Sequence, residues 1–87
     1  MPKFNACLSN DAAIFDSCDG FSSVADVLDW AAGRGGRYVV QIAREVKGED
    51  VDFISVVADS RRGKTTWSRY FPGGMVHVNA EQIADMI

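Results

Sequence analysis

At 87 residues the chain has the length of one small domain, and we treat residues 1–87 as a single folded unit. Hydrophobic residues make up 47% of the sequence and charged residues 24%, proportions that permit a core and exclude an intrinsically disordered chain. The formal net charge of −3 argues against a general nucleic-acid-binding protein, whose surface would be basic.

Two further classes are excluded by the distribution of apolar residues. No run is long and apolar enough to span a membrane. The start of the sequence lacks the uninterrupted apolar core of a signal peptide. We therefore expect a cytoplasmic protein in which Cys7 and Cys18 are free thiols, with a disulfide between them as the less favoured alternative.

The first part of the chain has the pattern of a strand or a hairpin. Apolar and polar residues alternate over residues 3–9, which predicts a strand. Residues 10–11 favour a turn, and residues 12–17 form a short second strand in this interpretation. Asp19 and Gly20 are then expected to form a turn that leads into the next element.

A capped amphipathic helix follows. Ser22 or Ser23 can accept a hydrogen bond from an unpaired backbone N–H of the first helical turn, and Gly33 suits the left-handed position that ends a helix. Between these limits, apolar residues recur at helical spacing and predict a face packed against a core. This stripe consists of Val24, Val27, Leu28 and Ala31.

Three β-prone runs come next. Residues 37–46, 51–58 and 65–71 are rich in β-branched and aromatic residues and predict a three-stranded antiparallel meander. The run at residues 51–58 is almost continuously apolar, so we expect a central strand covered on both faces. Residues 75–78 form a short extended segment in this interpretation.

The chain closes with a second predicted helix. Asn79 is its expected cap, and Gln82 stands at the capping-box position. Its apolar stripe is formed by Ile83, Met86 and Ile87. The order of elements predicts an α+β fold, in which a three-stranded meander and an N-terminal strand or hairpin make an antiparallel sheet with two helices packed on one face.

The motifs that would support catalysis or metal binding are incomplete. The segment RRGKTT at residues 61–66 resembles a phosphate-binding loop, but Ala58 stands where that loop needs a glycine, and the segment joins two predicted strands. His77 is the only histidine, and it lacks the close spacing to Cys7 or Cys18 of a zinc site. We therefore expect no metal, no cofactor and no enzymatic activity.

Acidic residues gather at the start of the chain. Residues 1–33 hold five aspartates and one lysine, and such a surface would attract and orient a basic partner. Trp30 would add an anchor if its side chain is exposed. The candidate protein-binding residues are Asp16, Asp19, Asp26, Asp29 and Trp30.

Basic residues gather in the middle of the chain and give an alternative. If the turns around residues 33–37 and 61–64 converge, their cations could bind phosphates while Tyr38, Trp67 or Tyr70 stack on bases. The function would then be weak binding of single-stranded nucleic acid. The candidate residues for this alternative are Arg34, Arg37, Arg61, Arg62, Lys64, Trp67 and Arg69.

In its short length, its acidity, its α+β order and its lack of a catalytic motif, the chain resembles the small stand-alone proteins of phages and mobile elements, including anti-CRISPR inhibitors. This resemblance implies a non-enzymatic inhibitor that binds a host complex at the surface where that complex handles nucleic acid. The aspartates at residues 11–29 would take the place of phosphates against arginines and lysines. The expected partner is a host protein or protein complex with a basic surface.

Overall fold

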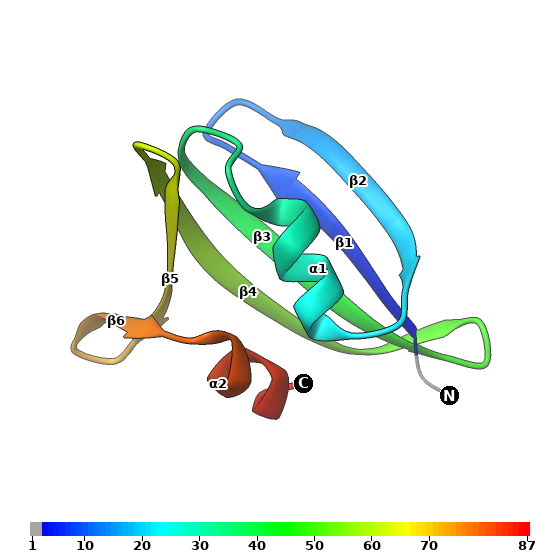
Figure 1. The fold of residues 1–87 in the computed structure, drawn as a ribbon. Coiled ribbons are helices and arrows are strands. Elements are labelled where there is room, and N and C mark those ends of the chain that lie inside the picture. Colours follow the sequence, from blue (N-terminus) through cyan, green and yellow to red (C-terminus); the bar gives the residue numbers. More distant parts are fainter. Residues whose placement is uncertain (1–2) are drawn as a thin grey trace.

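The computed structural model describes residues 3–87. Its elements follow the order β1 (Lys3–Ser9), β2 (Ile14–Phe21), α1 (Val24–Ala31), β3 (Gly36–Val46), β4 (Glu49–Arg61), β5 (Lys64–Phe71), β6 (Gly74–Val78) and α2 (Ala80–Asp85). The strands form one six-stranded antiparallel sheet in the order β2-β1-β3-β4-β5-β6 (Figure 1). This is the α+β class predicted from the sequence, and the sheet is larger than expected because β1 and β2 form the N-terminal hairpin and β6 adds a sixth strand to the predicted meander.

Both helices lie on the same side of the sheet (Figure 1). The apolar stripe of α1 is buried against residues that alternate along the central strands, as expected for strands with one covered face. The fully buried side chains include Leu8 on β1, Val27 on α1, Val40 on β3 and Ile83 on α2. α2 packs beside α1 and contributes to this same core.

The predicted helix caps are confirmed. The Ser23 hydroxyl accepts a hydrogen bond from the N–H of Asp26 at 3.1 Å. At α2, the Asn79 side chain accepts from the N–H of Gln82, and the Gln82 side chain accepts from the N–H of Asn79, which completes a capping box. These caps satisfy backbone donors that have no partner within the helix.

Two hairpins turn in the minimum number of residues. Lys47-Gly48 joins β3 to β4, and Arg62-Gly63 joins β4 to β5, with positive φ at both residues of each turn. This is the type I′ geometry, whose twist matches that of paired strands. The predicted strands leave residues 47–50 as their connection, whereas in the structure Glu49 and Asp50 belong to β4 and only Lys47 and Gly48 form the turn.

The predicted turn at Asp19-Gly20 is wrong, because both residues belong to β2. They stand together opposite the single residue Asn5, which forms a β-bulge. The N–H of Gly20, at a φ of 82°, donates to the Asn5 side chain at 3.1 Å. A glycine and an aspartate thus mark a bulge within a strand here rather than its end.

The expectation that residues 51–58 are covered on both faces is also wrong. Phe53 is 73% exposed and Val51 is 48% exposed, because both helices lie on the other side of the sheet. β5 pairs only with the second half of β4, from Val57 to Arg61. The first half of β4 therefore forms an edge of the described sheet, and one face of the sheet is open.

A buried hydrogen-bond network fixes the end of α1 to the sheet. The Tyr38 hydroxyl donates to the carbonyl oxygen of Ala31 at 2.7 Å and accepts from the N–H of Arg34 at 3.3 Å. With its proton used, it also accepts from the Ser60 hydroxyl at 2.9 Å, which in turn accepts from Thr65 at 2.8 Å. The same hydroxyl thus joins a helix end, a loop and two strands.

Replacing Tyr38 with Phe should lower the free energy of unfolding by about 1–3 kcal/mol, because buried partners lose a hydrogen bond and no water replaces it. Urea denaturation followed by tryptophan fluorescence measures this change. Tyr70→Phe is the matched control, since Tyr70 is 68% exposed. An equal loss of unfolding free energy in both variants would show that the Tyr38 hydrogen bonds do not stabilise the fold more than an exposed hydroxyl does.

Candidate protein-interaction surface

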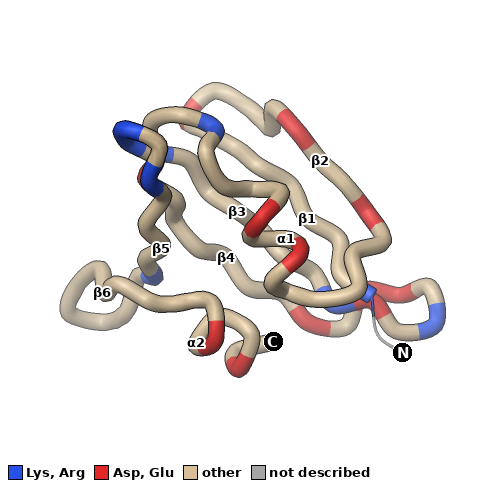
Figure 2. The backbone as a smooth tube through the Cα atoms, viewed as in Figure 1, with Lys and Arg blue, Asp and Glu red and all other residues tan. Residues whose placement is uncertain are grey.

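The outer side of the two helices is acidic. Asp26 and Asp29 lie off the apolar stripe of α1 and are exposed, and Glu81 and Asp85 are exposed on α2. None of these four carboxylates forms a salt bridge within residues 3–87. Figure 2 shows acidic positions on both helices and basic positions elsewhere. We call these four residues the acidic helical layer.

A depression lies beside these carboxylates, between α1, β5 and the start of α2. It has a volume of about 390 Å³, and its lining includes Leu28, Asp29, Trp67 and Ala80. Trp67 is half-buried and packs against the core, so its indole forms a fixed wall. An apolar hollow with a carboxylate at its rim suits the stem and charged head of a lysine or arginine side chain.

Of the acidic candidates predicted from the sequence, only Asp26 and Asp29 belong to the acidic helical layer. Asp16 lies on the helix side of β2, but its carboxylate accepts a hydrogen bond from Nη1 of Arg34 at 2.6 Å. Asp19 is exposed on the opposite, open face of the sheet. The structure thus separates residues that are close in the sequence.

Glu81 and Asp85 were not among the binding residues predicted from the sequence. They come from the far end of the chain, and the packing of α2 beside α1 adds them to the same surface. A signal was present: the predicted final helix carries two acidic residues and no lysine or arginine. Its pairing with the first helix could not be read from spacing alone.

Trp30 is half-buried rather than freely exposed. Its ring packs against that of Phe21, with 5.4 Å between the ring centroids. The guanidinium of Arg34 lies 4.9 Å from the centroid of the Trp30 ring and also donates to the Trp30 carbonyl oxygen. Trp30 and Arg34 therefore contact each other within the chain.

The two basic turns converge at one end of the sheet. The N–H of Gly33 donates to the Thr65 hydroxyl at 2.9 Å, and Figure 2 shows basic positions gathered there. Arg61 forms a salt bridge with Asp59, just as Arg34 does with Asp16. The basic turn residues without a salt bridge in the described chain are Arg37, Arg62 and Lys64.

The remaining members of the nucleic-acid set lie elsewhere. Arg69 contacts the sulfur of Met86, 2.8 Å from its Nη1, and Trp67 faces the helix side. Tyr38 is only 3% exposed, so it cannot stack on a base. Tyr70, 68% exposed, is the aromatic of this set that a base could reach.

The thiols and the histidine are not brought together. Cys7 pairs in register with Ser17, and Cys18 pairs with Ala6, so the two thiols point to opposite faces of the sheet and are both free. Nδ1 of His77 lies 3.2 Å from the hydroxyl of Ser68. Within residues 3–87 no group of three metal-ligating side chains is found.

Comparison with known proteins finds no matching family model, no matching curated protein and no matching solved structure. In the described part of the chain, neither helix has the length and apolar character needed to cross a bilayer. The surface chemistry of the fold is therefore the basis for inferring a function.

The stability contributed by the ion pair between Asp16 and Arg34 depends on pH. The hydrogen bond from the Arg34 guanidinium, aided by the N–H of Ser17 and opposed by partial burial, lowers the pKa of Asp16 below its usual 3.8. A carboxyl whose pKa is lower in the folded state stabilises the fold above the pKa of the unfolded state, and that contribution is lost as the pH falls through the folded pKa.

Asp16→Asn should therefore be less stable than the natural protein at neutral pH, and the difference should shrink below about pH 3.8. Urea denaturation at a series of pH values measures this difference. In Arg34→Ala, the Asp16 carboxyl should titrate at a higher pH by NMR. An unchanged Asp16 midpoint in that variant would contradict the role given to the guanidinium.

Proposed function

We propose that this protein is a non-enzymatic interaction protein whose acidic helical layer binds a basic surface of another protein. The observation that carries the proposal is the set of four exposed carboxylates on one side of the molecule, none neutralised by a cation of the described chain. Complementary charge raises the rate of association and selects the partner. The hollow beside Asp29 and Trp67 offers a place for one partner side chain to be desolvated.

The partner of this proposal is a host complex that handles nucleic acid. The lysines and arginines that hold phosphates in such a complex would be held instead by Asp26, Asp29, Glu81 and Asp85, since carboxylates form the same charge-assisted hydrogen bonds. Occupation of that surface blocks nucleic acid without any chemistry. An inhibitor of this kind agrees with the resemblance to the small acidic proteins of phages.

Affinity capture from a nuclease-treated bacterial lysate identifies the partner, and association kinetics then test the surface. Asp26→Lys combined with Asp29→Lys should slow association by roughly tenfold or more at low salt, because it reverses half of the acidic helical layer. The effect should diminish at high salt, where exposed charges are screened. Nucleic acid should compete with the natural protein for the partner.

The matched control is Asp11→Lys combined with Glu49→Lys, which changes the net charge equally at two exposed positions outside the helices, one between β1 and β2 and one at the start of β4. This control should slow association much less than the helix variant. If the two double variants slow association equally, the net charge of the protein determines the association rate, and the acidic helical layer has no specific role. Unchanged binding after reversal of Asp26 and Asp29 would overturn the proposal.

A second function is favoured by the convergence of the basic turns, which places Arg37, Arg62 and Lys64 near one end of the sheet, with Tyr70 exposed on β5. This is weak binding of single-stranded nucleic acid. The cations would contact the phosphates, and the Tyr70 ring would stack on a base.

Replacing Arg37, Arg62 and Lys64 with alanine should then flatten the salt dependence of binding. The slope of log affinity against log salt should fall by about 2, since each phosphate contact to a single strand contributes about 0.7. Fluorescence anisotropy with a labelled oligothymidine measures the slope. No detectable binding of the natural protein at low salt would dismiss this second function.

A further inference from the structure

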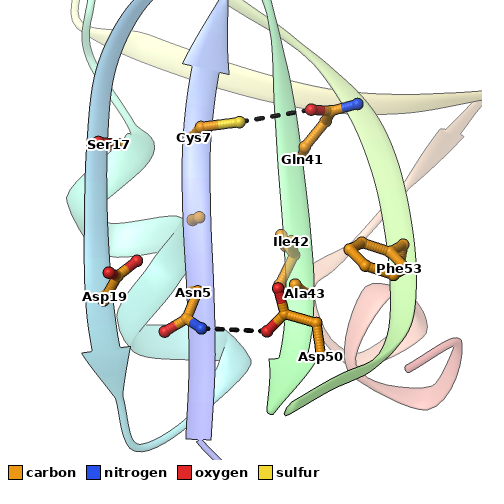
Figure 3. Close-up of a pocket in the computed structure, with 10 residues that line it drawn as sticks. Asn5, Cys7, Ser17, Asp19, Gln41, Ile42, Ala43, Asp50 and Phe53 are labelled. Carbon is orange, nitrogen blue, oxygen red and sulfur yellow. Dashed lines mark hydrogen bonds between the residues drawn. The ribbon is translucent and has the colours of Figure 1, made fainter. Parts of the chain in front are cut away.

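The open face of the sheet carries a hollow of about 220 Å³ that crosses β1, β3 and β4 (Figure 3). Its shape follows from the strand register. Asn5, Ala43 and Phe53 stand directly opposite one another on neighbouring strands, so their side chains share a face. Ala43, 8% exposed, forms the floor between the two larger side chains.

One wall of the hollow is an exposed aromatic ring. Phe53 is 73% exposed and lies on the half of β4 that β5 does not cover. The face of an aromatic ring carries negative charge density, so an exposed phenylalanine can bind a cation there. The adjacent edge of β4 leaves room for an extended peptide chain to approach this ring.

The other wall includes Asn5 and the Asp50 carboxylate, and the Glu45 carboxylate lies beside the hollow on the same amide. Nδ2 of Asn5 donates to Oε1 of Glu45 at 3.1 Å and to Oδ1 of Asp50 at 3.2 Å. The same side chain accepts from the N–H of Gly20 at 3.1 Å, so the amide cannot turn without losing a partner. One neutral amide thus donates hydrogen bonds to two carboxylates. Asp19 lies on the neighbouring strand β2 (Figure 3).

The charge on this wall is not neutralised within the described chain. Glu45, Asp50 and Asp19 form no salt bridge among residues 3–87. Lys3 stands opposite Glu45 in register, yet it forms no salt bridge with it. A second donor with a positive charge would stabilise these carboxylates more than the neutral amide alone.

We propose that this hollow binds an arginine side chain presented by a peptide segment of a partner protein. The guanidinium stacks on the Phe53 ring and donates to the Asp50 carboxylate, with Asp19 completing the negative surroundings. Arginine fits better than lysine because its planar group can stack and donate at the same time. The volume is below the roughly 300–1,000 Å³ of small-molecule sites, as expected for a single side chain.

This site goes beyond the proposed function, because it lies on the opposite side of the sheet from the acidic helical layer. A partner held at the helices leaves the hollow open. The two surfaces can therefore be tested, and can fail, separately.

The test uses the full chain labelled with ¹⁵N and a blocked Gly-Arg-Gly peptide as the probe. We expect chemical-shift changes centred on the Asn5 side-chain amide and on the backbone amides of Ala43 and Phe53. The counterpart peptide with citrulline, a neutral analogue of arginine of nearly the same shape, should cause no such changes. The lysine counterpart should bind more weakly than the arginine peptide.

Variants locate the binding to the hollow. Phe53→Leu and Asp50→Asn should each weaken binding by roughly two- to fivefold, the loss expected for one exposed cation–π contact or one exposed ion pair. Phe71→Leu and Asp11→Asn are the matched controls, since both residues are exposed and lie outside the hollow and outside the acidic helical layer, and neither change should alter the affinity.

Equal shifts with the citrulline peptide would overturn the proposal, as would shifts centred on the two helices. Equal affinity for the lysine peptide would overturn the assignment to arginine. Shifts at Ala43 and Phe53 that depend on protein concentration without any peptide would show that a second copy covers this face instead. The peptide comparisons use the natural chain, so they hold even if a variant fails to fold.

Discussion

The Tyr38 hydroxyl holds the end of α1 against the sheet, and the positions of the charged surfaces depend on this contact. It is one atom with one proton and two lone pairs, and all three are used: it donates to Ala31 and accepts from Arg34 and Ser60. Edge-to-face packing of the Phe15 ring, with 5.9 Å between centroids, encloses it further. Because the partners come from a helix end, a loop and a strand end, the angle of α1 on the sheet is set there.

The angle of α1 decides which charges share a surface. With the apolar stripe turned to the sheet, Asp26 and Asp29 must point outward, and α2 can reach the same core only by lying alongside. The carboxylates of the two helices then share one side. The basic turns are held apart from them, at the end of the sheet where Gly33 meets Thr65. A protein of modest net charge thus acquires separate acidic and basic regions.

Local signals account for the parts of the fold that were predicted correctly. The Ser23 and Asn79 caps, the apolar stripe of α1 and the strand at residues 3–9 each depend on a few neighbouring residues, and the structure confirms them. β2 was predicted too short because a bulge and a turn share the same residue types, aspartate and glycine. The apolar run of β4 indicated burial, but only the tertiary arrangement decides whether a second layer covers it.

The candidate sites were less predictable because they depend on the tertiary arrangement. Asp26 and Asp29 are two of the predicted residues, and helical spacing placed them on the outer face of α1. The contribution of Glu81, the pairing of Asp16 with Arg34 and the hollow floored by Ala43 all depend on contacts between distant residues. A hollow on a sheet requires the register of three strands at once, and no pattern in one strand contains that information.

The strand order has a consequence for the way the chain folds. Every junction in the sheet joins strands consecutive in the sequence except one, the pairing of β1 with β3, in which Cys7 contacts Gln41 across 34 residues. Hairpins close short loops at little entropic cost, whereas this junction must close a loop that contains β2 and α1. Folding of the sheet therefore has a single long-range step, and the core that α1 shares with β3 and β4 is complete only after that step.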